Sequence, residues 1–502
     1  MLVRPRTPLL LLAVALGGCG DDLPMSPSGS SSSSGEPATT GSSTTAVVDE
    51  GTTSASTSET TAESGGDTGF PPPRAECGNG YVEAGEECDD GNAEDEDGCN
   101  NACEVPCGLQ WFELTLGPTL DSEIEGLAIA RDANDQIVLA GRLREITVDM
   151  EGTVTEGDDT VLVQSHDPTG AMVWAQVLGT PDGDAIVAGV AVDGVGDVYV
   201  AATVDAADGG RAIRVTKLAA DDGTSPWVHD FDGPFVGEDE IATGIAVGPD
   251  GQPVVTGQVR AGAGDDDVWL RKLDAADGSE VWTQTYTGAG SGGFSTDDGG
   301  PLAIGPDGSI YVLARIYEDF QTQRGTLLRF GPDGGPPQWT FVPTIGGADQ
   351  TFEPVAVSVG ADGRPVMGVL RAGGFVDFWV TALDASGQEQ WTKSRADFEV
   401  ADAGSDWLLE GLAHSGEELV VLGRYVNDQR LGGSSWWEAW VTRLDADGMP
   451  RCAVLQQAEY EGLLPPSLRG YAVTATSDGS AVVTGEQTSS DELALWLGSF
   501  RG

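Results

Sequence analysis

The chain has 502 residues, with 25 Lys and Arg against 81 Asp and Glu, a formal net charge of −56, and three histidines. So negative a chain cannot neutralise phosphates, which excludes nucleic acid and anionic lipid headgroups as partners. Three scattered histidines leave little material for a His-rich metal site or a histidine-driven acid–base centre. The length accommodates one large β architecture with additional segments.

Residues 1–18 have the features of a secretory signal peptide. Arg4 and Arg6 precede an apolar run from Leu9 to Leu16 that is too short to span a bilayer comfortably. The run ends in Leu-Gly-Gly-Cys19, which resembles the lipobox of bacterial lipoproteins. This resemblance implies that Cys19 is lipidated; the alternative is an ordinary secretory signal that contains a cysteine. We therefore expect an extracytoplasmic protein, lipid-anchored at the outer membrane or cell surface.

Residues 19–76 are dominated by Ser, Thr and Gly, with acidic residues and few large apolar side chains. Such a composition cannot bury enough apolar surface to offset the entropy of ordering. It predicts a disordered tether between the lipid anchor and the folded part of the chain.

Residues 77–106 form an acidic, cysteine-rich segment with Cys77, Cys88, Cys99 and Cys103. In an exported chain this density indicates disulfides, because so short a segment has little core of its own. The pattern CGNG, GEECDDGN, DGC and a closing Cys resembles a disulfide-rich repeat of myxobacterial surface proteins. The resemblance implies an extracellular structural module, and the spacing leaves three pairings of the four cysteines open.

One loop of this module has the composition of a Ca²⁺ site. Hard cations prefer oxygen ligands, which a dense run of carboxylates supplies, although the spacing differs from that of an EF-hand. The alternative is a solvated acidic loop without a cation. The candidate ligands are Asp89, Asp90, Asn92, Asp95 and Asp97.

Residues 107–502 repeat a unit of four alternating apolar runs joined by Gly/Asp turns, which predicts four-stranded meanders. The fourth-strand aromatic recurs at Trp111, Trp174, Trp227, Trp282, Trp339 and Trp391, and Cys452 takes its place in the sixth unit. Four-stranded units of this period build β-propellers, where radial repetition protects sheet edges. The last unit lacks a fourth strand, and residues 110–117 form a strand without a unit. Pairing the two predicts an all-β, seven-bladed propeller closed by N- and C-terminal strands.

The segment 272–282, KLDAADGSEVW, resembles the tryptophan-docking repeat of quinoprotein-like propellers, and the whole pattern resembles bacterial seven-bladed propeller repeats. Quinone-dependent dehydrogenases of this kind often have an adjacent cysteine pair and a set of calcium ligands. The sequence has no adjacent cysteines, and no ligand set can be mapped onto it. We therefore expect no enzymatic activity and no cofactor, apart from the Ca²⁺ hypothesis above.

Cys107 and Cys452 are left when Cys19 and the four module cysteines are set aside. Both lie at fourth-strand positions of neighbouring blades, so a disulfide between them would fasten the ring closure. A partner for Cys107 inside the small module is the alternative.

Other candidate sites are weaker. The clusters Asp265–Asp267 and Asp297–Asp298 are interpreted as solvated inter-strand loops. His414 replaces an apolar first-strand residue and could lie near the central channel, although a packed strand residue is the simpler interpretation. The insertion between the second and third strands of the sixth unit gathers Tyr425, Arg430, Trp436 and Trp437. Aromatics with an arginine suit a glycan or protein contact, but either tryptophan could start a strand and pack between blades.

These observations favour an envelope lipoprotein with a monomeric propeller that acts as a non-catalytic binding or scaffolding protein for envelope proteins or polysaccharide. The first alternative is an extracytoplasmic enzyme acting on a sugar or alcohol. The second is an outer-membrane assembly scaffold, which would need exposed apolar edge strands; the sequence predicts none.

Overall fold

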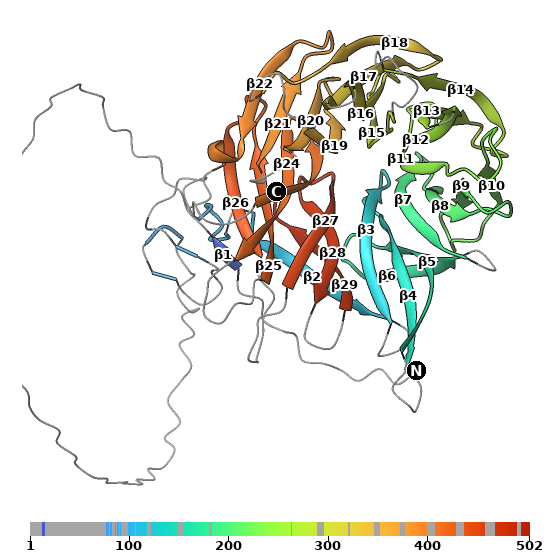
Figure 1. Ribbon diagram of the computed structural model, residues 1–502. Coiled ribbons are helices and arrows are strands. Elements are labelled where there is room, and N and C mark those ends of the chain that lie inside the picture. The colour runs from blue at the N-terminus through green and yellow to red at the C-terminus, as the bar shows by residue number, and fades with distance from the viewer. Residues whose placement is uncertain are drawn as a thin grey trace, which may run out of the picture.

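The computed structural model describes residues 13–15, 77–79, 81–82, 86, 88–89, 91, 99–105, 107–117, 122–148, 154–179, 183–262, 264–288, 296–319, 322–345, 352–371, 377–398, 407–427, 436–456, 467–488 and 493–502. Cys19 and the predicted tether lie outside these ranges. Seven antiparallel sheets surround a central channel (Figure 1). In this part of the chain, no helix has the length and apolar character needed to cross a membrane.

The blades follow one another along the chain. Blade 1 consists of β3 (Glu123–Arg131), β4 (Ile137–Val148), β5 (Val154–His166) and β6 (Met172–Leu178). Blade 2 consists of β7 (Ala185–Val192), β8 (Val198–Asp205), β9 (Arg211–Leu218) and β10 (Trp227–Phe231). Blade 3 consists of β11 (Ile241–Val247), β12 (Pro253–Gly262), β13 (Asp265–Leu273) and β14 (Glu280–Tyr286). Blade 4 consists of β15 (Leu302–Ile304), β16 (Ile310–Asp319), β17 (Thr322–Gly331) and β18 (Gly334–Phe341).

The remaining blades follow in chain order, and blade 7 combines three C-terminal strands with one strand from the N-terminal end of the propeller. Blade 5 consists of β19 (Phe352–Val359), β20 (Pro365–Arg371), β21 (Phe378–Leu383) and β22 (Glu389–Ser394), and is followed by the 3-10 turn η1 (Arg395–Asp397). Blade 6 consists of β23 (Trp407–Ser415), β24 (Glu418–Asn427), β25 (Trp436–Leu444) and β26 (Pro450–Gln456), with β1 (Ala13–Ala15) along the edge of β26. Blade 7 consists of β27 (Ser467–Ala475), β28 (Ala481–Thr488), β29 (Leu493–Phe500) and β2 (Leu109–Leu116).

The ring closes in blade 7. Strand β2 pairs antiparallel with β29, with Leu114 opposite Trp496 and Trp111 opposite Ser499. Each inner strand contacts the inner strand of the next blade, and β27 contacts β3 to complete the circle. The prediction of a seven-bladed all-β propeller with terminal strand closure is therefore confirmed.

The burial pattern explains why these segments form strands. The second strands are buried on both faces because neighbouring blades cover them, and β8 is buried along nearly its whole length. The fourth strands alternate between partly buried and exposed residues, as in β14, because only one face packs against the next blade. The hydrophobic core thus lies between blades.

The recurring tryptophan connects each blade to the next one. The indole N–H of Trp174 donates to the carbonyl of Ala220 at 2.9 Å, and that of Trp391 donates to the carbonyl of Ala446 at 3.0 Å. The ring of Trp174 lies on Gly223, where an added Cβ would come within 2.7 Å of it. Because Gly223 also has a φ of +69°, the turn requires glycine for both its conformation and the close approach.

The disulfides differ in what they connect. Cys77 pairs with Cys103 and Cys88 with Cys99 inside the small module. Cys107 pairs with Cys452, one of the two arrangements that the sequence left open. Arg501 adds an ion pair to Glu104 at 3.2 Å, so the module is fastened to the propeller beside its closure.

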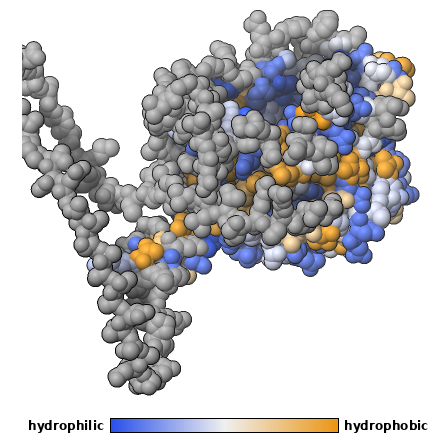
Figure 2. Space-filling model, turned by 90° about the horizontal axis from the view of Figure 1, so that it is seen from below, coloured by the Kyte–Doolittle hydropathy of each residue, from blue (hydrophilic) through white to orange (hydrophobic). Residues whose placement is uncertain are grey.

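The outer edges of the blades differ from the sequence prediction, which gave no exposed apolar edge strands. Fourth strands do expose apolar side chains, namely Met172, Val173 and Val177 on β6 and Leu114 and Leu116 on β2. Val228 and Val281 are single exposed residues on other blades. Sequence alternation could not separate residues that face a neighbouring blade from those that face solvent. Seen from below, the coloured part of the surface intersperses apolar and hydrophilic residues (Figure 2).

The docking contact generates a first prediction. Replacing Trp174 by Ala removes a buried ring and a hydrogen bond, so we expect a loss of about 3–5 kcal/mol in the free energy of unfolding. Trp174→Phe keeps most of the packing and should cost less. Thermal unfolding followed by circular dichroism tests this; an unchanged midpoint in Trp174→Ala would show that the docking contact contributes nothing.

The closure generates a second prediction. Cys452→Ser removes the disulfide that joins two residues 345 positions apart in the sequence. We expect destabilisation of up to about 5 kcal/mol, because the unfolded chain regains loop entropy. Cys107→Ser should have the same effect, and the double variant should be no worse than either single one. Additive losses in the double variant would contradict a shared bond.

Candidate functional site

The propeller has a cavity of about 500 Å³ at the end of the channel where the inner strands finish. Its lining comes from five blades, through the ends of β3, β19, β23 and β27 and the turn after β7. We call this region the channel mouth; its polar side chains belong to Arg131, Asp132, Asp193, Ser358, His414 and Thr474. A cavity of this volume lies in the range that accommodates small ligands.

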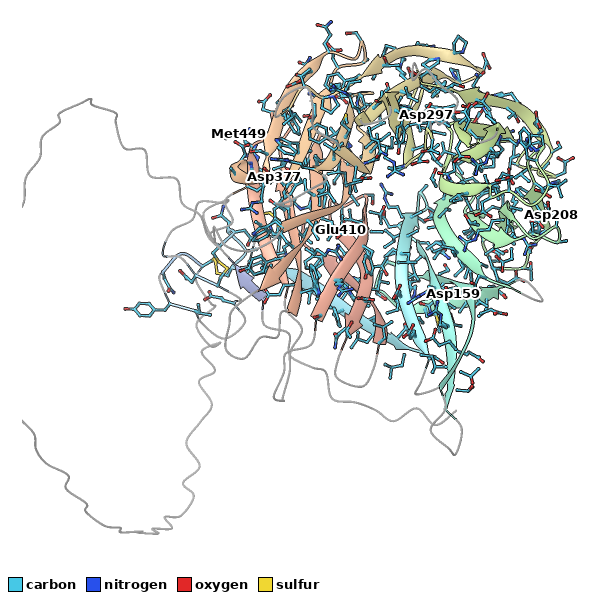
Figure 3. All side chains as sticks on the ribbon, viewed as in Figure 1. Asp159, Asp208, Asp297, Asp377, Glu410 and Met449 are labelled. Atoms are coloured by element: carbon cyan, nitrogen blue, oxygen red, sulfur yellow. A yellow bond between two sulfur atoms is a disulfide. The ribbon has the colours of Figure 1, made fainter. Side chains whose placement is uncertain are left out.

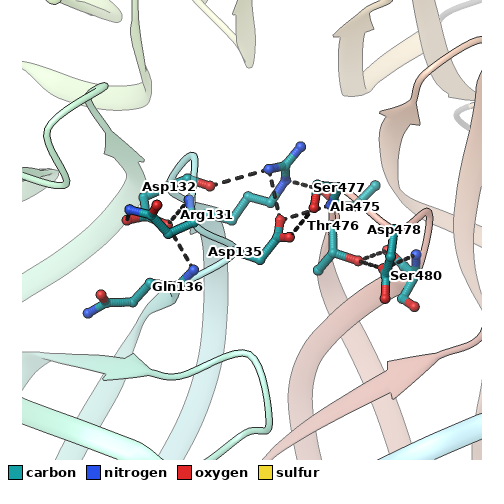
Figure 4. A network of polar contacts seen from close by, with 10 residues as sticks. Arg131, Asp132, Asp135, Gln136, Ala475, Thr476, Ser477, Asp478 and Ser480 are labelled. Carbon is teal, nitrogen blue, oxygen red and sulfur yellow. Dashed lines mark hydrogen bonds and ion pairs between the residues drawn. The ribbon is translucent and has the colours of Figure 1, made fainter.

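Arg131 is held in place across the seam between blades 1 and 7. Its Nη1 donates to Asp135 at 2.9 Å, and its Nε donates to the carbonyl of Ala475 in blade 7. Asp135 in turn accepts the backbone N–H of Ser477 at 2.8 Å (Figure 4). The Arg131 side chain is 30% exposed, so the guanidinium is fixed yet reachable from the cavity.

The aspartates of the mouth are occupied by their own turns. Asp132 accepts the backbone N–H groups of Asn134 and Gln136, both at 2.8 Å. Asp193 accepts two backbone N–H groups of its turn through Oδ1, and the hydroxyl of Tyr199 donates to its Oδ2 at 3.1 Å. These carboxylates shape the rim and have few lone pairs left for proton transfer.

His414 lines the channel mouth, although a packed strand residue was the simpler interpretation of the sequence, and it has a serine partner that the sequence did not predict. Its Nδ1 lies 2.8 Å from Ser358 Oγ, and its backbone N–H donates to the same oxygen at 3.2 Å. Burial lowers the pKa of His414 to about 4, opposed by the nearby Asp362. The imidazole is therefore uncharged at neutral pH and a weak base, so the pair is not an activated nucleophile.

The other two histidines lie elsewhere. His166 is buried in blade 1 with Nδ1 2.9 Å from the carbonyl of Gly170, and burial lowers its pKa. His229 lies on β10, where its Nε2 is 3.0 Å from the carbonyl of Asp277. Both serve turns and docking contacts of their blades.

The predicted binding residues of the sixth blade do not lie together in the structure. Tyr425 is buried in the core, with its ring centroid 4.5 Å from that of Trp407, so its placement in an exposed loop was wrong. Trp436 starts β25, and Trp437 packs between blades, beneath the guanidinium groups of Arg424 and Arg469 at 4.7 and 4.9 Å. Arg430 and the side chain of Trp436 lie outside the described residues.

The interpretation of two acidic clusters as solvated loops was also wrong. Asp266 and Asp267 belong to β13 and are buried, and Asp297 is fully buried. Asp297 accepts the backbone N–H groups of Gly288 and Tyr317, and burial raises its pKa. Backbone donors satisfy this carboxylate, which explains how a charged residue is accommodated between strands.

Within the disulfide module, Asp89 is the one predicted Ca²⁺ ligand that the structure describes. It accepts backbone N–H groups from Gly78, Asn79 and Gly91 at 2.8–3.1 Å, so it organises the chain around the first cysteine. The other predicted ligands lie outside the described residues: Asp90, Asn92, Asp95 and Asp97. The Ca²⁺ site stays a prediction.

Sequence reasoning missed Glu410, on the inner strand of blade 6. In six of the seven inner strands the pairing register shifts by one residue, and the extra residue is Leu127, Ala188, Thr243, Val355, Glu410 or Tyr471. Such bulges re-aim a side chain. Glu410, labelled in Figure 3, pairs with Arg424 at 2.6 Å, and burial raises its pKa to about 7.

Comparisons with known proteins found one family match and distant likenesses to solved structures. A family described as "Domain of unknown function (DUF4215)" matches residues 74–104, which include the disulfide module. No curated protein matches the chain.

Three solved structures share the fold over 78% of this chain. Quinohemoprotein alcohol dehydrogenase from Comamonas testosteroni is 12% identical, with 76% of its chain covered and a TM-score of 0.38. The Dos1 propeller is 10% identical, with 95% covered and a TM-score of 0.41. A protein of unknown function from Dyadobacter fermentans is 10% identical, with 99% covered and a TM-score of 0.40. At these values the likeness is one of fold alone.

A third prediction concerns the pH dependence of stability. Unfolded His414 takes up a proton near its ordinary pKa of 6.5, whereas the folded form resists protonation until about pH 4. Acidification through this window therefore favours the unfolded state, by on the order of 3 kcal/mol in full. His414→Asn should lose stability less steeply between these pH values, measured by urea denaturation at each pH. Identical slopes in both proteins would contradict the assignment.

Proposed function

We propose that this protein is an envelope-anchored lipoprotein whose propeller binds polysaccharide at the channel mouth without transforming it. The observation that carries the proposal is the 500 Å³ cavity with a polar lining and a single fixed arginine, Arg131. A hydroxyl-rich ligand supplies donors and acceptors that match such a lining. Because Arg131 is already immobilised, binding costs little additional side-chain entropy.

The chemistry of the mouth supports binding over catalysis. Among the described residues that line it, His414 is too weak a base at neutral pH, and Asp132 and Asp193 are engaged by their turns. The anchor rests on the resemblance around Cys19. The tether and the disulfide module would hold the propeller away from the membrane surface.

One observation favours an enzymatic alternative. Glu410 titrates near neutral pH beside two arginines, and a carboxyl group in this range can exchange protons with a substrate. An enzyme acting on a sugar or alcohol is therefore the second candidate function, with Glu410 as its acid–base group.

The fourth prediction tests binding at the mouth. Neutral oligosaccharides added to the full chain should give saturable heat in isothermal titration calorimetry, without any new product in the recovered sugar. Arg131→Gln should weaken this binding by about tenfold, the loss expected for one charge-assisted hydrogen bond.

Arg329→Gln is the matched control, because Arg329 is also held by polar side chains of its own blade, including Ser309 at 2.7 Å, but does not line the mouth. Unchanged affinity in Arg131→Gln would overturn the assignment of the site. Binding of envelope proteins with no binding of any oligosaccharide would replace the polysaccharide by a protein partner.

A further inference from the structure

The channel carries a second polar site where the inner strands begin, at the end opposite the mouth. Charged and aromatic side chains from blades 6, 7 and 1 meet there. We call them the charged cluster, which consists of Glu123, Glu125, Arg142, Glu410, Arg424, Trp437, Arg469, Tyr471 and Glu486. None of these residues lines the cavity at the mouth.

The contacts run continuously across two blade seams. In blade 6, Glu410 pairs with Arg424 at 2.6 Å, and Trp437 packs beneath the guanidinium groups of Arg424 and Arg469. Arg469 lies on β27 of blade 7 and reaches across the seam to Trp437, and within its own blade its Nη1 lies 2.8 Å from Glu486.

The chain of contacts continues into blade 1. Glu125 lies next to Glu486, and its carboxylate pairs with Arg142 at 2.6 Å. The hydroxyl of Tyr471 lies 3.4 Å from Arg469.

The balance of charge in the cluster depends on its carboxyl groups. Arg142 also pairs with Glu123 at 3.3 Å, so three arginines face four glutamates, and the cluster carries one net negative charge when every glutamate is ionised. Burial raises the pKa of Glu410 to about 7, and burial together with Glu486 raises that of Glu125. Protonation of both Glu410 and Glu125 therefore leaves the cluster with one net positive charge, in a chain with a formal net charge of −56.

The arginines remain accessible while they are held. The side chains of Arg142, Arg424 and Arg469 are 25, 23 and 30% exposed, whereas Glu486 is only 4% exposed. Their ion pairs and the shared tryptophan fix the orientation of the guanidinium groups. A site with fixed, partly exposed cations and buried acceptors is preorganised for an anion that also carries hydrogen-bond donors.

We propose that the charged cluster binds a hydroxylated carboxylate, such as a sugar acid, with Arg424 and Arg469 on the carboxylate and Glu125 and Glu486 accepting hydrogen bonds from hydroxyl groups. A simple carboxylate, such as an acidic peptide side chain, offers these two glutamates no hydroxyl donors. A neutral sugar offers the arginines no carboxylate. The inference goes beyond the proposed function and does not depend on ligand binding at the mouth.

Binding of an anion should draw a proton onto Glu410, because protonation removes the charge that competes for Arg424. The strands packed against β23 bring several charged or titratable groups, namely Glu353 on β19, Arg371 on β20, Arg424 on β24, and Arg469 and Tyr471 on β27. Of these, Arg424 and Arg469 act on Glu410 through their charge.

The test is calorimetric titration of the full chain with D-glucuronate, D-glucose and acetate near neutral pH. We expect saturable binding of glucuronate, and at least about tenfold weaker binding of the other two, since each lacks one of the two recognised features. Repeating the titration in buffers of different ionisation enthalpy should reveal uptake of up to one proton per glucuronate bound. Glu410→Gln should abolish that uptake while retaining glucuronate binding.

Arg424→Gln should weaken glucuronate binding by about tenfold or more. Arg271→Gln is the matched control, because Arg271 also lies over two aromatic rings, at 4.4 and 4.9 Å, but in blade 3. Glu486→Gln is a second variant that retains the shape of the side chain and should reduce the preference for glucuronate over acetate. Thermal unfolding verifies that each variant is folded. Absence of glucuronate binding, equal affinity for glucose, or an unchanged affinity in Arg424→Gln would each overturn the proposal.

Discussion

The closure of the ring is the constraint on which the whole propeller depends. Every other blade is a local meander, but blade 7 exists only when β2 pairs with β29, and these strands lie at opposite ends of the folded chain. Elsewhere a tryptophan of one blade lies on a turn glycine of the next. Blade 7 has no such turn, because its third and fourth strands come from the two ends of the chain. The disulfide between Cys452 and Cys107 takes the place of that docking contact at the seam between blades 6 and 7.

The architecture could be predicted from the sequence because its determinants are periodic. Trp174, Trp391 and their equivalents recur with the turn glycines that they cover, and both residue types are required by the same contact. The candidate sites were harder to predict, because they depend on single departures from the repeat. Glu410 is the extra residue of a bulge in β23, and nothing in the local sequence marks this bulge. Tyr425 looked exposed because it begins an insertion, whereas β24 extends as far as Asn427 and buries it.

Some of the many acidic residues of the chain stabilise the fold. Turn aspartates such as Asp132 and Asp384 accept backbone N–H groups of their own turns and so fix the short connections between strands. For Asp384 the hydrogen bond from the Ser386 hydroxyl, together with these backbone bonds, lowers the pKa, so the folded turn stabilises the ionised form. Negative charge at such turns is therefore structural. Because the chain has only 25 basic residues, the arginines at the two ends of the channel stand out as candidate binding groups.

The two ends of the channel are consequently different in chemistry and in orientation. At the mouth one arginine stands among aspartates whose lone pairs are largely occupied, which suits a neutral, hydroxyl-rich ligand. At the opposite end three arginines meet glutamates, and burial raises the pKa of two of these, Glu410 and Glu125, which suits an anion once they are protonated. Cys107 directly precedes β2, and outer strands such as β2 and β26 start on the side of the mouth, so the disulfide module joins the propeller on that side. The mouth is therefore the end of the channel on the side of the disulfide module, and the charged cluster is the end away from it.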